Sequence, residues 1–214
     1  MANPGAGSFP QAAIEWLAPA DPGSVLAVGT GSLPTALRYA RRGHRITLVD
    51  KDGGQLGRIA DRHPDLLAVV AAPEALPFAA HSYDQVLVAQ GLHLLAPGLA
   101  LAEFARVLGP NGLLVVVTPT ASHLEGLRQR YGLLAIEPDK DARLARSMLG
   151  HFVGIANVGL DYEVEASASV VRDLIAMGPN AFHAVPESVH DERVRISVTV
   201  SLFRKQDAAG LTLE

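Results

Sequence analysis

Short apolar runs alternate along the chain with stretches whose apolar positions recur at helical spacing. This alternation is typical of a parallel sheet with helices packed on it, so we predict an α/β fold. The early runs are apolar at nearly every position, which indicates that helices cover both faces of the sheet. The strands predicted for this part span residues 24–28, 45–49, 66–70, 84–89 and 112–118.

Beyond Pro119 the pattern is looser but still predicts regular elements. Residues 193–204 alternate polar and apolar side chains, which predicts a strand with one less buried face. The other expected elements are helices at 10–17, 100–108, 122–131 and 170–177 and a strand at 158–168. We therefore predict one domain over residues 1–214. Within it, residues 1–23 form a lead-in helix region and residues 132–168 cover the substrate.

The composition fits a single domain and excludes several kinds of chemistry. With 49% hydrophobic residues in 22.5 kDa, the chain can bury one sizeable core. It shows neither a bilayer-spanning run nor a signal-peptide pattern, so we expect a cytoplasmic protein. The absence of cysteine excludes disulfides, thiolate zinc sites and cysteine nucleophiles, and we predict no metal site. A net charge of −4 makes nucleic acid an unfavoured partner.

A glycine-rich turn follows the first predicted strand and opens a helix. It runs from Val28 through Gly29, Thr30 and Gly31. Asp50 closes the second strand 19 residues after Gly31, where a carboxylate can accept hydrogen bonds from ribose hydroxyls. The order of strand, turn, helix, strand and acid predicts a nucleotide site. The alternative is a tight turn with Asp50 as a helix cap.

The turn lacks the third glycine of a dinucleotide-binding fingerprint, because Pro34 stands in its place, and this disfavours NAD. Four blocks in sequence order decide between cofactors: VLAVGTGS, ITLVDKD, PEALPF with SYDQVLVAQGLHLL, and EFARVLGPNGLLVVV. With these blocks the chain resembles the class I S-adenosylmethionine-dependent methyltransferases.

That resemblance implies a seven-stranded sheet whose carboxyl ends hold S-adenosylmethionine. It implies the methionine part above the turn at Val28, Gly29, Thr30 and Gly31, and the ribose on Asp50. The adenine would lie between the loop at Lys51 and the loop formed by Ala72, Pro73 and Glu74, with Gln90 facing the sulfonium. The family commonly has acids where Ala27 and Ala72 stand, so we expect weaker or differently organised cofactor binding.

The second half is similar to the bacterial guanine-N1 methyltransferases of large-subunit ribosomal RNA, in Thr118-Pro119, in residues 122–127 with Tyr131, and in Met177-Gly178-Pro179-Asn180. Those enzymes add an N-terminal four-cysteine zinc module that helps to engage RNA, and this chain contains no cysteine. Its net charge is negative and its aromatic residues are few. From these features we expect the scaffold to act on a smaller, uncharged acceptor.

Three histidines are candidate general bases, because an imidazole titrating near neutrality can accept the proton of a substrate hydroxyl. His93 follows the fourth strand and His123 the fifth, so both belong to the carboxyl edge of the sheet. His151 lies in a less regular stretch that we expect to cover the pocket. Each has a structural alternative, respectively packing at the sheet edge, capping the next helix, or lying in a solvated loop. His44 and His63 are expected at the surface.

The sequence thus predicts an S-adenosylmethionine-dependent methyltransferase that releases S-adenosylhomocysteine. Its predicted acceptor is a small hydroxylated molecule, such as a sugar or secondary metabolite, methylated on oxygen by in-line displacement. The first alternative is a ribosomal RNA guanine-N1 methyltransferase. The second is a protein that binds S-adenosylmethionine without catalysis. The sequence leaves open whether the protein is a homodimer.

Overall fold

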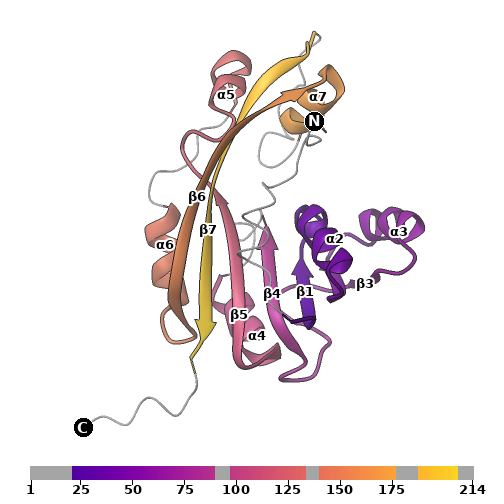
Figure 1. The fold of residues 1–214 in the computed structure, drawn as a ribbon, viewed down its shortest axis with the longest axis vertical. Coiled ribbons are helices and arrows are strands. Elements are labelled where there is room, and N and C mark those ends of the chain that lie inside the picture. Colours follow the sequence, from indigo (N-terminus) through magenta and orange to yellow (C-terminus); the bar gives the residue numbers. More distant parts are fainter. Residues whose placement is uncertain (1–20, 90–96, 134–139, 177–187, 207–214) are drawn as a thin grey trace.

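The computed structural model describes residues 21–89, 97–133, 140–176 and 188–206. It shows one seven-stranded sheet in the order β3-β2-β1-β4-β5-β7-β6 (Figure 1). The strands are β1 (Ser24–Val28), β2 (Arg45–Asp50), β3 (Leu67–Val70), β4 (Tyr83–Ala89), β5 (Leu108–Pro119), β6 (Phe152–Ala166) and β7 (Glu192–Lys205). The helices are η1 (Thr30–Ser32), α2 (Leu33–Arg41), α3 (Gly53–Arg62), α4 (Pro97–Val107), α5 (Glu125–Tyr131), α6 (Lys140–Met148) and α7 (Ala168–Ala176).

The first five strands are parallel to one another, and β7 runs antiparallel to both β5 and β6. The carboxyl ends of β1 to β5 therefore meet at one edge of the sheet, which we call the carboxyl edge. The predicted α/β class and mostly parallel sheet are confirmed. The predicted helix at 10–17 lies outside the described residues.

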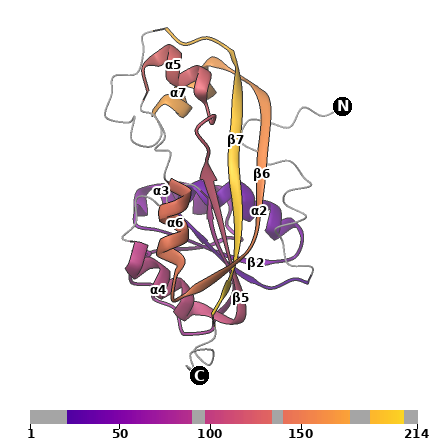
Figure 2. The same cartoon turned by 90° about the vertical axis from the view of Figure 1, so that its left-hand side faces the viewer.

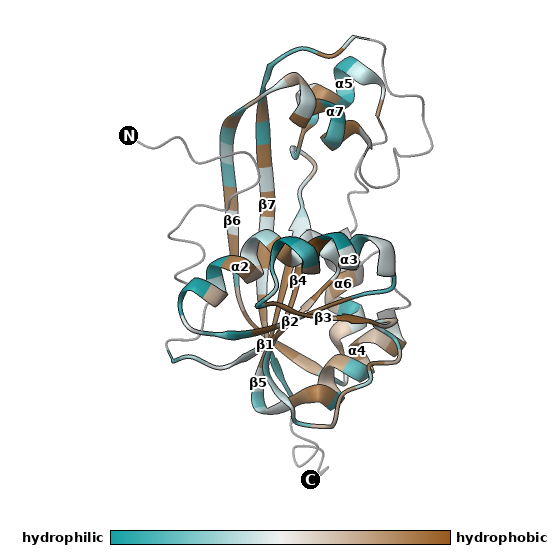
Figure 3. Cartoon of the chain, turned by 90° about the vertical axis from the view of Figure 1, so that its right-hand side faces the viewer, coloured by the Kyte–Doolittle hydropathy of each residue, from teal (hydrophilic) through white to brown (hydrophobic). Residues whose placement is uncertain are grey.

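Helices cover both faces of the sheet, as the apolar strands predicted. Leu26 of β1 packs in a core with Phe104 of α4 and Met148 of α6, whereas Val25 packs on the other face with Tyr39 of α2. Neighbouring strand residues thus serve opposite cores, because side chains alternate across a strand. Figure 3 shows the same division, with apolar residues along the central strands and polar residues on the outer sides of α2 and α3.

The hairpin of β6 and β7 is longer than the rest of the sheet. The pairing of β5 with β7 ends at Pro119 and Val198, but β6 and β7 stay paired as far as Ala166 and Glu192. Helices α5 and α7 pack on this extension around a third apolar core (Figures 1 and 2). We call residues 120–133, 161–176 and 188–197 the hairpin lobe. It stands beyond the carboxyl edge.

The segment 132–168 differs from the expectation that it covers the substrate. Its helix, α6, contributes Leu144 and Met148 to the core shared with α4, and residues from Phe152 onward are paired with β7 in the sheet. The strand predicted at 158–168 starts six residues later than β6. Exposed and half-buried residues alternate along nearly all of β6, so no continuous apolar run marks where it begins. Much of the segment expected to cover the site is therefore part of the scaffold.

Candidate functional site

The turn after β1 has a backbone that only glycine adopts without strain. Gly29 has φ of 78° and ψ of 143°, and its N–H donates to the carbonyl of Val49 at 2.8 Å. A Cβ built on Gly29 would meet no atom within 4 Å. The glycine is therefore required by its dihedral angles, and the turn presents bare backbone to open space, where a ligand can approach closely.

Ser32 ties this turn to the sheet, a role that the sequence did not reveal. Its buried hydroxyl donates to the carbonyl of Val28 at 2.6 Å and accepts from the N–H of Ala89 at 2.9 Å. One side chain thus joins the ends of β1 and β4 below the start of α2. In the sequence, this role is indicated only by the presence of a serine directly after Gly31, and a single serine in a turn is a weak indication.

Asp50 links the ends of three strands. Its Oδ2 accepts from the N–H of Thr30 at 2.8 Å, its Oδ1 accepts from the N–H of Asp52 at 2.9 Å, and its carbonyl accepts from the N–H of Ala71 at 3.0 Å. Asp52 caps α3 instead, by accepting from the N–H of Gln55. The reading of Asp50 as a helix cap is therefore wrong. Each of its oxygens keeps lone pairs for ligand hydroxyls.

The loop after β3 is held in place by an ion pair. Glu103 accepts the N–H of Leu76 at 2.7 Å, and Arg106 donates to the carbonyls of Leu76 and Phe78 at 2.9 and 2.7 Å. The two side chains also bind each other through two contacts of 2.7 and 2.8 Å. This hydrogen bonding holds the pKa of Glu103 below its usual range and raises that of Arg106. We call the pair the loop clamp.

The clamp positions the loop predicted to flank the adenine. Ala72 is exposed, Pro73 is buried and Glu74 is half-buried, and a turn is closed by the N–H of Ala75 donating to the carbonyl of Ala72 at 3.0 Å. The structure therefore brings the turn, Asp50 and this loop together at the carboxyl edge. The predicted cofactor residues gathered there are Val28, Gly29, Thr30, Gly31, Asp50, Lys51, Ala72, Pro73 and Glu74. Gln90 and His93 lie outside the described residues.

His123 lies beyond this edge, in the first part of the hairpin lobe, four residues after β5 ends at Pro119. Its N–H donates to the carbonyl of Thr120 at 3.0 Å, and its Nδ1 accepts the N–H of Ser197 at 3.2 Å. Arg128 of α5 donates to the carbonyl of His123. The histidine is thus held from both its ring and its backbone, and it is not the N-cap of α5, which is Leu124.

His151 lies at the opposite edge of the sheet. It immediately precedes β6, whose first residue, Phe152, is paired with Lys205 near the end of β7. Because β6 runs in the direction of β5, its start belongs to the amino ends of the parallel strands. The structure therefore does not bring His151 to Gly29 and Asp50, and the expectation that it covers the pocket does not match this position.

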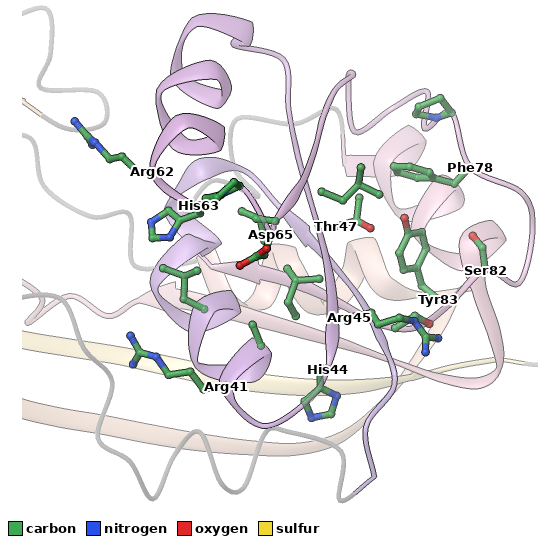
Figure 4. A pocket seen from close by; sticks show the side chains of 18 of the residues that line it. Arg41, His44, Arg45, Thr47, Arg62, His63, Asp65, Phe78, Ser82 and Tyr83 are labelled. Carbon is green, nitrogen blue, oxygen red and sulfur yellow. The ribbon is translucent and has the colours of Figure 1, made fainter.

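A groove of about 1110 Å³ also opens at that opposite edge, between the ends of α2 and α3 and the start of β2. Figure 4 shows Arg41, Arg45, Arg62 and His63 around it. Arg41 and Arg62 lie in the last turns of their helices, where a cation stabilises the helix dipole. His44 lines the groove too, but its side chain is buried rather than at the surface as expected. None of the predicted cofactor residues lines this groove.

Comparisons with known proteins identify relatives of this chain among the methyltransferases. A sequence family described as "Methyltransferase domain" matches residues 26–116. A Micromonospora griseorubida protein, provisionally described as a 23S rRNA (guanine-N(1)-)-methyltransferase, is 35% identical over 92% of this chain and 64% of its own length. The Streptomyces fradiae 23S rRNA (guanine(748)-N(1))-methyltransferase is 31% identical over 79% of this chain and 71% of its own.

A crystal structure of an S-adenosylmethionine-dependent methyltransferase from Methanosarcina mazei has the same fold. It superposes with a TM-score of 0.61 at 16% identity, over 90% of this chain and 96% of that one. Because the Streptomyces relative is 31% identical and covered over 71% of its length, the chain belongs to the class I S-adenosylmethionine-dependent methyltransferases. Over most of its length it is related to 23S rRNA guanine-N1 methyltransferases, and it spans about two thirds of the length of the two relatives above.

The described part of the chain lacks the features of two other kinds of protein. Within it, no helix combines the length and the apolar character that crossing a membrane requires. The same residues contain no group of three or more histidines and carboxylates placed to hold a metal ion.

Proposed function

We propose that this protein transfers a methyl group from S-adenosylmethionine to N1 of a guanine in RNA. The proposal rests on how far along the chain two similarities extend, one to methyltransferases in general and one to a relative named as an RNA methyltransferase. The general methyltransferase match ends at residue 116, before the hairpin lobe begins, whereas similarity to the Micromonospora protein extends over 92% of the chain. Cofactor residues are common to methyltransferases of many acceptors, so similarity beyond them carries information about the acceptor.

The residues at the carboxyl edge fit the cofactor. The open backbone at Gly29 leaves room for the methionine part, and the lone pairs of Asp50 can accept the two ribose hydroxyls. The loop at Ala72, positioned by the clamp, would flank the adenine. When bound, S-adenosylmethionine supplies an electrophilic methyl group on a positively charged sulfur.

The proposed reaction balances without a metal or a redox partner. The guanine N1–H proton is released to water, and N1 forms a bond to the methyl carbon. The bond between sulfur and methyl breaks, its electron pair stays on sulfur, and S-adenosylhomocysteine leaves as a neutral thioether. The enzyme needs to hold the base in line with the methyl group and to stabilise the charge that develops on the base.

O-methylation of a small hydroxylated acceptor is the second candidate function. The observation that favours it is the net charge of −4, because polyanion binding usually rests on an excess of basic residues. Ala27 and Ala72, where family members commonly carry acids, favour a third candidate, a binding protein without catalysis. Turnover on any acceptor would eliminate that third candidate.

The experiment offers the purified protein radiolabelled S-adenosylmethionine with either in vitro transcribed 23S RNA fragments or a panel of sugars and phenols. Digestion of the RNA and mass spectrometry of the nucleosides identify the product. The proposal expects 1-methylguanosine and a reverse-transcription stop at the modified base, because N1 methylation blocks Watson–Crick pairing. Methylation of a small hydroxylated compound, with no label in RNA, would reverse the order of the two candidates.

A further inference from the structure

The groove at the amino ends of the parallel strands carries an excess of positive charge. Among the described residues, the charged side chains that line it are Arg41, Arg45, Arg62 and Asp65. All four residues are exposed, and Figure 4 shows the three arginines at different points around the groove. A guanidinium binds phosphate oxygens well because it offers several N–H donors in one plane. Three of them around one groove favour an anion that carries several phosphates.

The ion pairs of the described residues leave these arginines unused. Those pairs are Arg106 with Glu103, Arg130 with Glu192, Arg193 with Glu163 and Glu165, and Arg195 with Asp161. None of them includes Arg41, Arg45 or Arg62. The helix dipole accounts for Arg41 and Arg62, which lie in the last turns of α2 and α3, but it does not account for Arg45, which begins a strand.

The positive charge continues along α3 toward the cofactor. Arg58 and Arg62 are exposed and lie four residues apart, so they share one face of this helix. Lys51 is exposed directly after β2, at the carboxyl edge. We call Arg41, Arg45, Arg58 and Arg62 the arginine track. It leads from the groove along α3 in the direction of the cofactor edge.

The arginine track is a basic region in an acidic chain. Residues 41–65 hold six of the 18 Lys and Arg residues but only four of the 22 Asp and Glu residues. Of these four acids, Asp52 is engaged as the cap of α3, and Asp61 and Asp65 are exposed and offset part of the charge. Binding of a polyanion depends on the local distribution of charge as well as on its sum. The net charge of −4 therefore does not describe this surface.

The groove is too far from the cofactor residues for one small acceptor to reach both. Arg45 begins β2 and Asp50 ends it, and the five residue steps between them span about 17 Å. A sugar or a phenol is much shorter than this distance, whereas a nucleic acid duplex covers it in roughly half a helical turn. A contact at the groove therefore strengthens binding only for a polymeric acceptor.

We propose that the arginine track binds the phosphate backbone of the RNA whose guanine is methylated at the carboxyl edge. This inference rests on the proposed function. The stem next to the target base lies along the outer side of α3, with phosphates at Arg58 and Arg62 and further phosphates at Arg41 and Arg45. Such contacts carry no information about the base sequence, and they hold the RNA in position while the target base reaches the methyl group.

The first test measures RNA binding without turnover. A fluorescein-labelled hairpin of 23S RNA, with guanines in its loop and a stem of about one helical turn, is titrated with the protein and S-adenosylhomocysteine at several salt concentrations. In the triple variant Arg41→Gln/Arg45→Gln/Arg62→Gln, we expect the affinity for RNA to fall at least about tenfold. The slope of log K against log salt should become shallower by about two to three.

Single substitutions provide the matched control. Arg62→Gln alone should make the salt slope shallower by about one. Arg204→Gln removes an exposed arginine near the end of β7, four strands away from β2 in the sheet, and should change neither the slope nor the affinity. Equal effects of the two substitutions would overturn the proposal, because RNA binding would then depend on total charge and not on the track.

Further variants distinguish charge from packing. Replacing Arg41, Arg45 and Arg62 by lysine keeps the positive charge, so most of the affinity and of the salt dependence should be retained. A loss as large as in the glutamine variant would overturn the proposal. Shortening the stem to about a third of a turn should weaken binding to the unmodified protein but not to the glutamine variant. Affinity for S-adenosylhomocysteine should stay within about twofold in every variant, because no predicted cofactor residue lines the groove.

The outcomes separate the inference from the proposed function. If the unmodified protein makes no 1-methylguanosine, the proposed function fails, and the binding measurements still decide whether the track holds RNA. If 1-methylguanosine is made while the glutamine variant keeps both its affinity for RNA and its salt slope, the inference fails and the proposed function stands. Competition by poly-glutamate as strong as that by unlabelled RNA, at equal concentration of charge, would overturn the inference in favour of an acidic protein partner.

Discussion

Two carboxylates two residues apart have different tasks at the end of β2. Asp52 caps α3, and the backbone N–H of Gln55 holds the pKa of its carboxyl below the ordinary value. Asp50 binds the N–H groups of Thr30 and Asp52 and so joins the glycine turn to the second strand. The spacing from Gly31 leads us to predict Asp50 for the nucleotide site, and the hydrogen bonds show that Asp52 is the helix cap.

Replacing Asp50 by alanine should lower the affinity for S-adenosylhomocysteine by at least about tenfold, because hydrogen bonds to a charged group contribute about 1.5–3 kcal/mol each. Calorimetric titration measures the effect. Asp52→Asn is the matched control, since asparagine is an equally good helix cap and should leave the affinity near that of the unmodified protein. Equal losses in the two variants would contradict the ribose assignment.

His44 should make stability depend on pH. Its side chain is 5% exposed and its Nδ1 accepts the N–H of Gly23 at 3.1 Å, so protonation would place two donors against each other. Burial, with a smaller effect from Arg42, holds the pKa of His44 below its ordinary value. The unfolded chain therefore binds the proton more readily. The stabilisation is present above about pH 6.5 and is lost as the pH falls toward the folded-state pKa.

Urea unfolding at pH 7.5, 6.5 and 5.5 measures this effect. The free energy of unfolding should fall over that range in the unmodified protein and less steeply in His44→Asn, whose amide oxygen can still accept the N–H of Gly23. An unchanged slope in the variant would assign the pH dependence to other groups.

At the scale of elements, local sequence patterns predicted the positions of the first four strands. The predicted strands at 24–28, 45–49, 66–70 and 84–89 correspond to β1, β2, β3 and β4 within one residue at each end. Continuous apolar runs bounded by turns identify buried parallel strands without knowledge of their partners. The class of fold and the glycine turn follow from the same local information.

The features missed by the sequence depend on residues far apart in the chain. The loop clamp joins Arg106 to carbonyls 28 and 30 residues earlier, and Ser32 bonds to the N–H of Ala89. The full length of β6 and the burial of His44 depend equally on distant partners. No periodicity reports such contacts, because each partner alone resembles an ordinary surface residue.

The loop clamp supports a prediction at this scale. In Arg106→Ala the carbonyls of Leu76 and Phe78 lose their donor and Glu103 loses its partner, which should destabilise the loop by about 1 kcal/mol after allowing for its partial exposure. We expect S-adenosylhomocysteine affinity to fall about fivefold to tenfold while the fold is retained.

Calorimetry and circular dichroism together check the loop prediction. Arg106→Lys should recover only part of the loss, since an ammonium cannot form the two-point contact. Arg172→Ala, on the exposed side of α7, is the control and should change neither quantity. Unaltered affinity in Arg106→Ala would mean that the loop at Ala72 does not contribute to the cofactor site.

At the scale of the whole molecule, the carboxyl edge and the hairpin lobe rest on different apolar cores, and the proposed function would assign the cofactor to the first and the acceptor to the second. Two cores cover the faces of the sheet and support the glycine turn, Asp50 and the clamped loop. The third core lies in the hairpin lobe and includes Leu127, Val171 and Ile175. The chain passes from β5 into the lobe directly after Pro119. A protein built in this way can change its acceptor by altering the lobe while keeping the cofactor edge.

This separation predicts that a cavity in the lobe affects the two functions unequally. Ile175 is 2% exposed, and its replacement by alanine should cost about 2–5 kcal/mol, most of it as local opening of α5 and α7. Methylation of RNA should fall more than tenfold, because the proposed function assigns the acceptor to the lobe that this core supports. Affinity for S-adenosylhomocysteine should change less than about twofold.

Leu26→Ala is the matched cavity in the sheet, at a side chain with no exposed surface beneath the glycine turn, and it should weaken both activities together. Hydrogen exchange distinguishes the two variants: Ile175→Ala should speed exchange in residues 124–131 and 168–176 and leave β1 and β4 protected. Faster exchange throughout the sheet in that variant, with a parallel loss of cofactor affinity, would show that the lobe and the sheet unfold as one unit. The acceptor site could then not vary independently of the cofactor site.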